Sequence, residues 1–299
     1  MNLSPIVLFV YNRLSHTQLT VEALQKNDLA SESELFIYSD AGKDENIQKS
    51  VDEVREYIQT INSFKKVTII ERNKNWGLAD SIIDGVTTIV NEYGRIIVLE
   101  DDLVTSPYFL TFMNEALDYY KDEKRVWHIS GWNYPIDNDE LDDTFLWRAM
   151  NCWGWATWAD RWKDYDKGAQ KVVTLFSKDE IKAFNIDGYY KNFWAQVKDN
   201  RDQRINTWAI FWYVTIFKKN GLCLNPSKTF VQNIGNDGSG ENCINYDFYQ
   251  KELNHRNDIV LQPYIEENEL ALMKIQQFYK QNPFKLVDRI KSKLKRLFS

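Results

Sequence analysis

Apolar and polar residues follow a regular order along the first 120 residues. Short apolar runs with the length of buried strands alternate with segments whose apolar residues recur at helical spacing. The expected strands are residues 6–10, 34–38, 67–70 and 95–99, and the expected helices are residues 15–27, 47–62, 79–92 and 106–120. Ser106 and Pro107 suit the N-cap and the first position of the last helix. This alternation predicts an α/β fold with a parallel sheet between helices.

The second half of the chain has a less regular pattern. Residues 208–220 form an expected helix that is apolar on nearly all sides and is therefore expected to be buried. The expected strands of this half are residues 126–130, 145–148, 222–224 and 230–232.

Three acidic residues, Glu100, Asp101 and Asp102, follow the fourth expected strand directly. Ligands of open α/β sheets bind at the carboxyl ends of the strands. Adjacent carboxylates repel one another unless a cation or hydrogen-bond donors neutralise them, and their hard oxygens suit Mg²⁺ or Mn²⁺. We therefore expect a divalent metal here that holds the diphosphate of a nucleotide. The alternative is a solvated acidic turn.

Polar residues also follow the first two expected strands. Residues 11–13 come after the first strand and Asp40 after the second. Because parallel strands end at one edge of a sheet, these residues and the acidic run are expected to gather there. This convergence favours a binding site over a simple turn.

Composition narrows the classes of function. The 299 residues suit one large domain or a domain with a smaller lobe, and the net charge of −6 argues against a general nucleic-acid binder. The eleven Trp and sixteen Tyr residues suit a cleft for sugars or bases, or a core. Three cysteines without metal-type spacing suggest a reducing compartment. We find no signal peptide and no membrane-spanning apolar run, so we expect a cytoplasmic protein.

The last segment, residues 283–299, has a different character. It carries six basic residues and one acid, and its apolar residues recur at helical spacing. A basic amphipathic helix is typical of a peripheral membrane anchor. It could equally pack on the acidic body of the protein, and both readings stay open.

Several ordered motifs resemble those of a known family. They are residues 7–13, 75–80, 98–103, 130–132, 152–155 and 220–226. With them the chain resembles sugar-nucleotide-dependent glycosyltransferases of the GT-A fold, and more narrowly bacterial polysaccharide enzymes related to the N-acetylglucosaminyltransferase I group. The resemblance covers about residues 6–243. It implies a Rossmann-like mixed sheet flanked by helices, to which the residue pattern of 283–299 adds a C-terminal amphipathic helix.

The resemblance also implies a division of the chain and roles for residues. Residues 1–125 would bind the nucleotide sugar, residues 126–260 the acceptor, and residues 261–299 would form a helical tail. The nucleotide-sugar contacts would be Tyr11, Asn12, Arg13, Asp40, Asn75, Trp76, Gly77, Asp80, Glu100 and Asp101. Asp102 would be the direct ligand of Mn²⁺ or Mg²⁺. The pocket for the acceptor and donor sugar would include Trp132, Trp153, Gly154 and Trp155. As alternatives, Asp40 could cap a turn and the tryptophans could belong to the core.

The chain departs from the resembled group at two places. In that group an aspartate at the start of the helix that matches residues 208–220 acts as the general base. This chain has Ala209 and Ile210 at the corresponding positions. Asp202 and Asp237 are the remaining candidates for the catalytic base. Many relatives also carry a histidine near the end of a glycine-rich loop, where this chain has Asn242.

The implied reaction is transfer of a hexosyl or N-acetylhexosaminyl group from a nucleotide diphosphate, expected to be UDP, to a glycan or lipid-linked acceptor. The resemblance implies inversion at the sugar and a role in lipopolysaccharide or capsule synthesis at the inner membrane face. One alternative is a glycan- or nucleotide-sugar-binding protein with a degenerate site. The other is a sugar nucleotidyltransferase, although the loop after the first strand lacks the glycine typical of that class.

Overall fold

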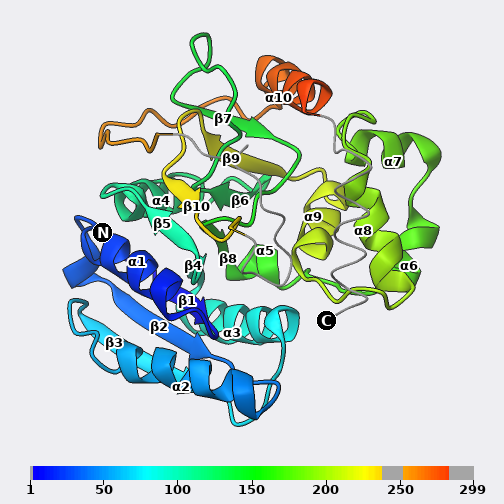
Figure 1. Cartoon of the computed structure of the whole chain (residues 1–299). Helices are drawn as coiled ribbons and strands as arrows, with labels where there is room; N and C mark the ends of the chain where they lie inside the picture. The colour runs from blue at the N-terminus through cyan, green and yellow to red at the C-terminus, as the bar shows by residue number, and fades with distance from the viewer. Residues whose placement is uncertain (1–2, 238–251, 283–299) are drawn as a thin grey trace.

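The computed structural model of the protein describes residues 3–237 and 252–282. Its centre is an eight-stranded mixed sheet with the strand order β3-β2-β1-β4-β8-β6-β9-β7 (Figure 1). In that order the strands are β3 (Lys66–Glu71), β2 (Glu34–Ser39), β1 (Ile6–Val10), β4 (Arg95–Glu100), β8 (Trp155–Trp158), β6 (Val126–Ser130), β9 (Leu222–Pro226) and β7 (Thr144–Trp147). A small second sheet pairs β5 (Leu103–Thr105) with β10 (Val231–Asn233). The expected mixed α/β fold is confirmed.

The first four strands of the large sheet are parallel, as the alternating pattern predicted. Leu8 at the centre of β1 lies opposite Ile37 of β2 and Leu99 of β4, and all three side chains are fully buried. The helices that connect and flank these strands are α1 (Leu14–Gln25), α2 (Glu45–Ile58), α3 (Leu78–Tyr93) and α4 (Phe109–Tyr119). This half brings the carboxyl ends of four strands to one edge.

Helix α3 packs very closely on the sheet because of a glycine. A Cβ atom at Gly85 would lie 2.8 Å from the ring of Phe9 in β1, which is closer than real contacts allow. The helix then ends at Gly94, whose φ of 80° is the left-handed conformation common at helix C-termini. The chain enters β4 immediately afterwards.

The remaining strands make the sheet mixed. β8 is antiparallel to both β4 and β6, β6 is parallel to β9, and β7 is antiparallel to β9. The sequence pattern did not predict β8. It also missed four short helices of this half, which are α5 (Ala159–Trp162), α6 (Ala169–Leu175), α7 (Lys178–Phe184) and α8 (Asn192–Arg201). Helix α10 (Glu269–Gln281) lies within the expected helical tail at residues 261–299. Helix α9 (Ala209–Lys218) is buried on most sides, as expected.

The predicted start of α4 is wrong by two residues, because the N-cap is Tyr108 and the prediction placed it at Ser106. The helix begins at Phe109 rather than near Ser106, and Tyr108 at the N-cap makes no capping bond with its side chain. The hydroxyl of Ser106 accepts a hydrogen bond from the N–H of Tyr108 over 3.4 Å and donates one to the carbonyl of Asn254. A distant contact therefore uses the group that the local pattern assigned to the cap.

The described C-terminal residues run back along β7. The Thr144 hydroxyl donates to the carbonyl of Val260 over 3.0 Å, and the backbone N–H of Asn268 donates to the carbonyl of Leu146 over 2.8 Å. The predicted basic helix at residues 283–299 lies outside the described residues. Among those that are described, no helix is both long and apolar enough to cross a membrane.

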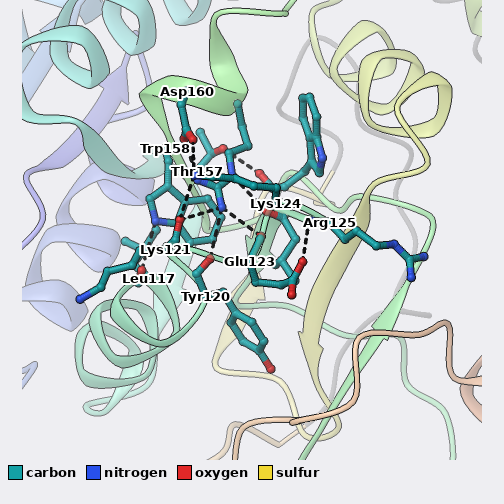
Figure 2. A network of polar contacts seen from close by, with 12 residues as sticks. Leu117, Tyr120, Lys121, Glu123, Lys124, Arg125, Thr157, Trp158 and Asp160 are labelled. Carbon is teal, nitrogen blue, oxygen red and sulfur yellow. Dashed lines mark hydrogen bonds and ion pairs between the residues drawn. The ribbon is translucent and has the colours of Figure 1, made fainter.

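A buried arginine ties the loop before β6 to the segment after β8. Arg161 donates hydrogen bonds to the carbonyls of Tyr120, Lys121, Glu123 and Val126 and pairs with Asp160 at 2.7 Å. The guanidinium also lies 4.4 Å from the ring centre of Trp158. Figure 2 shows this network from close by. It closes the edge of the sheet opposite the acidic turn.

We expect Arg161→Met to lower the free energy of unfolding by about 3 kcal/mol or more, because several buried carbonyl groups lose their donor. Lys124→Ala is the matched control. It removes the other partner of Asp160, but the Lys124 side chain is 67% exposed, so the loss should stay below about 1 kcal/mol. Urea denaturation measures the free energy of unfolding of both variants. Equal effects of the two substitutions would contradict the role given to Arg161.

Candidate active site

The acidic turn stands at the end of β4. The four apolar residues 96–99 of this strand are buried and carry the chain to the sheet edge, where the turn begins. Asp101 and Asp102 are only 5% and 7% exposed, and Glu100 is half-buried. The turn is therefore shielded from water, unlike a solvated surface turn.

Arg13 provides the positive charge in direct contact with this turn. It follows β1, the strand that pairs with β4, and its side chain reaches across to the acids. One guanidinium nitrogen, Nη2, donates to Oδ2 of Asp102 over 2.8 Å and to Oδ1 of Asp101. The predicted gathering of the first-strand loop and the acidic run at one edge is thus present.

The turn holds more negative charge than Arg13 neutralises. Burial, together with the charges of Asp102 and Asp101, raises the pKa of Glu100 well above its usual range. Burial also raises the pKa of Asp101, although Arg13 opposes that shift. Three carboxyl groups therefore share one guanidinium in a poorly solvated place.

The small second sheet closes a loop over the turn. β5 follows the acidic residues directly and pairs with β10, which leads into residues 234–237. The N–H of Ile234 donates to the carbonyl of Asp102 over 2.9 Å. A Cβ atom at Gly235 would lie 2.1 Å from Oδ2 of Asp102, so only a glycine permits this approach.

The same loop brings Asp237 to the site. Its carboxylate lies 3.1 Å from Nε2 of His16 on α1, and the Asp237 side chain is 47% exposed. His16 stands three residues after Arg13, so both side chains project from the first turn of α1 toward the acidic turn. Asp237 is accordingly near the acids and still open to solvent.

The acidic turn has the donor atoms that a divalent metal needs. Oδ2 of Asp101 is buried and has no hydrogen-bond partner among the described residues, and the carboxylates exceed the cations. Hard carboxylate oxygens with unmet negative charge fit Mg²⁺ or Mn²⁺. Within the described residues, no three His, Cys, Asp or Glu side chains already form a metal-binding group. The carboxylate oxygens therefore fit a divalent metal, and Arg13 holds one oxygen of each aspartate, Oδ1 of Asp101 and Oδ2 of Asp102.

Asp40 organises the loop before α3. Its carboxylate accepts hydrogen bonds from the backbone N–H groups of Ala41, Trp76 and Gly77 over 2.8 to 2.9 Å. This is the capping role that the sequence left open as an alternative. A contact of Asp40 with the nucleotide stays a prediction.

The other predicted nucleotide-sugar residues lie around this loop. Asn75 donates to the carbonyl of Ala41 over 2.6 Å and to the hydroxyl of Tyr11 over 3.4 Å. The ring of Trp76 packs under the guanidinium of Arg72 at 4.0 Å. Asp80, in the first turn of α3, pairs with Lys167 at 3.1 Å. Asn12 is half-buried between Tyr11 and Arg13.

The predicted tryptophan pocket is mostly packed interior. Trp155 is 1% exposed and stacks with His128 and Trp208 at 5.4 and 5.1 Å, and Trp132 is 3% exposed. Trp153 is half-buried and meets Trp132 edge-on at 4.7 Å. Gly154, at a φ of 63°, allows the close approach of Val231. In this conformation Trp153 keeps the surface that ligand contact needs, and the two buried rings do not.

The second candidate base, Asp202, has a different environment. It ends α8 and pairs with Arg201 at 2.6 Å and with Arg204 at 2.9 Å. The hydrogen bond from Arg201 lowers the pKa of Asp202, which weakens it as a proton acceptor. Among residues 3–237 and 252–282, no hydrogen bond or ion pair joins Asp202 to the acidic turn.

Sequence reasoning did not single out His16 or Lys167. His16 lies three residues after Arg13, near the start of a predicted helix, and this spacing was a usable signal. Nζ of Lys167 donates hydrogen bonds to Oδ1 of Asp80 and to Oδ1 of Asn206. No local sequence pattern predicts these contacts.

A comparison with protein families shows the family to which the protein belongs. The profile described as glycosyl transferase family 2 matches residues 6–161, which is more than half of the chain. The protein belongs to this family and is a glycosyltransferase. No curated protein matches the chain by sequence.

Three solved structures are among those to which the chain is similar. The mannosyltransferase PcManGT from Pyrobaculum calidifontis, solved with GDP-Man and Mn²⁺, is 12% identical at a TM-score of 0.41, with 73% of this chain and 72% of that chain covered. S. aureus TarS is 13% identical at a TM-score of 0.37, and the match covers 54% of this chain but 30% of TarS. Mouse xyloside xylosyltransferase 1 is 8% identical at 0.37, with 72% and 81% covered. Similarity at this level carries no argument about substrates.

Proposed function

We propose that this glycosyltransferase moves a hexosyl or N-acetylhexosaminyl group from a UDP-sugar to a hydroxyl of a glycan or lipid-linked acceptor, with inversion and with a divalent metal. The observation that supports this most directly is the buried acidic turn beside Arg13 at the carboxyl edge of the parallel strands. That edge is where nucleotides bind in such sheets.

The donor site extends from the acidic turn to the loop before α3. Tyr11, Asn75 and the backbone held by Asp40 form its nucleotide side, and Arg13 forms its diphosphate side. Arginine suits phosphate because its planar donors match the oxygens. Asp80, in the first turn of α3, is proposed to contact the donor sugar.

In the reaction, the acceptor oxygen bonds to the anomeric carbon while the bond from that carbon to the diphosphate oxygen breaks. The electron pair stays on the diphosphate, and the acceptor proton passes to a carboxylate. Mn²⁺ or Mg²⁺, held by Asp102, supplies Lewis-acid stabilisation of the leaving diphosphate when it is bound. Arg13 contributes positive charge at the same place.

Asp237 is the better of the two candidate bases. It is open to solvent beside the acidic turn, and His16 orients its carboxylate. Asp202 is held by two arginines, which favour its unprotonated form and make it a poor acceptor of a proton.

The acceptor is proposed to be lipid-linked and to belong to polysaccharide synthesis, with the protein on the inner membrane face. The support is the sequence of residues 283–299, where basic and apolar residues alternate as in peripheral membrane helices.

Asp102→Asn should lower turnover about 100-fold or more, because the leaving diphosphate loses its stabilisation. A chelator should have the same effect on the unchanged protein. Release of UDP from a UDP-sugar measures both. Asp118→Asn, on the exposed end of α4, is the control with the same change of charge. Full activity of Asp102→Asn in the presence of chelator would overturn the metal role.

Asp237→Asn should lower turnover by a factor of about 10² to 10⁴ while UDP still binds, as expected on removal of a general base. Asp202→Asn should retain most activity. Steady-state transfer assays and UDP titrations separate the two effects. Loss of activity only in Asp202→Asn would assign the base to that residue.

Deletion of residues 283–299 should reduce binding to vesicles that contain anionic lipids and leave binding to neutral vesicles unchanged. Co-sedimentation measures this. Equal binding of the full chain and the shortened chain to anionic vesicles would favour a helix that packs on the body.

A further inference from the structure

The ion pair between Arg13 and the acidic turn is incomplete on both sides. Nη2 of Arg13 serves both aspartates, whereas Nη1 is buried and has no hydrogen-bond partner among the described residues. Oδ2 of Asp101 is also buried and has no hydrogen-bond partner among the described residues. Arg13 and its acids are therefore in contact, but neither side is fully satisfied. A buried donor or acceptor without a partner is costly, so further ligands are favoured here.

Arg13 also occupies one oxygen of each aspartate that could bind a metal, Oδ1 of Asp101 and Oδ2 of Asp102. Its contact with Oδ2 of Asp102 measures 2.8 Å, and Gly235 packs against both groups. A divalent ion that binds Asp102 through Oδ2 must therefore displace the guanidinium. The displaced Arg13, 18% exposed, would then lack a counter-charge in a poorly solvated place.

A diphosphate removes that obstacle. Its oxygens offer Arg13 a new partner of the same charge as the carboxylates that it leaves. The metal can then take the carboxylates, and the two ligands assist each other.

We propose that Arg13 is a resident counter-cation that exchanges between the Asp101–Asp102 carboxylates and the diphosphate of the donor, so that divalent metal and nucleotide bind cooperatively. This inference rests on the proposed function and adds the order of events to it: the metal alone binds weakly because Arg13 competes with it. Arg13 is a positioning residue for the metal and a binding residue for the diphosphate.

The test measures Mn²⁺ binding and needs no turnover. Free Mn²⁺ is followed by electron paramagnetic resonance during titration of the full chain, with and without UDP. In Arg13→Gln, Mn²⁺ alone should bind about 5- to 150-fold more tightly than in the unchanged protein, which is the usual range of coupling between two ligands. The affinity for UDP in the absence of metal should fall.

Two variants control for charge and for general effects. Arg13→Lys keeps the positive charge and should keep Mn²⁺ binding weak. Arg125→Gln removes an exposed arginine at the opposite edge of the sheet and should change neither affinity. Thermal denaturation adds a second readout, since Mn²⁺ should raise the Tm of Arg13→Gln more than that of the unchanged protein.

The outcomes separate the two proposals. If Mn²⁺ binds the unchanged protein with UDP, but Arg13→Gln binds Mn²⁺ alone no more tightly, the exchange is wrong and the proposed function stands. If the unchanged protein binds no Mn²⁺ even with UDP, the metal-dependent function fails and the exchange fails with it.

Discussion

The candidate site depends on the ion pair of Arg13 with Asp101 and Asp102. The pair joins the ends of β1 and β4, which are neighbours in the sheet, so the order of the strands decides that these side chains meet. Buried charges are stable only when they are paired. One arginine against three carboxyl groups leaves a local excess of negative charge, and the proposed binding of a divalent metal depends on this excess.

The sequence was most informative where structure is local. The first four strands and their helices were predicted because each apolar run is bounded by turn residues and buried in a parallel sheet. From that topology it followed that the Tyr11–Arg13 loop, Asp40 and the acidic turn share an edge. Family membership then made glycosyl transfer the conclusion.

Prediction was weakest where distant contacts decide the outcome. The strand β8 (Trp155–Trp158) was missed because its aromatic residues also suit a pocket. Its partner strands β4 and β6 also lie far away in sequence. The burial of Trp155 follows from that pairing. The place of Asp237 beside His16 follows from the β5–β10 pairing, which no local pattern indicates.

The β5–β10 pairing also bears on how the protein is made. Thr105 pairs with Val231, so well over a hundred residues must be translated after the acidic turn before its covering strand exists. At ordinary rates of synthesis this takes about 6–25 s. During that interval the nascent chain carries the acids and Arg13 but not the segment that encloses them. The site is thus completed late in translation, and a chain released early would have an uncovered anionic edge.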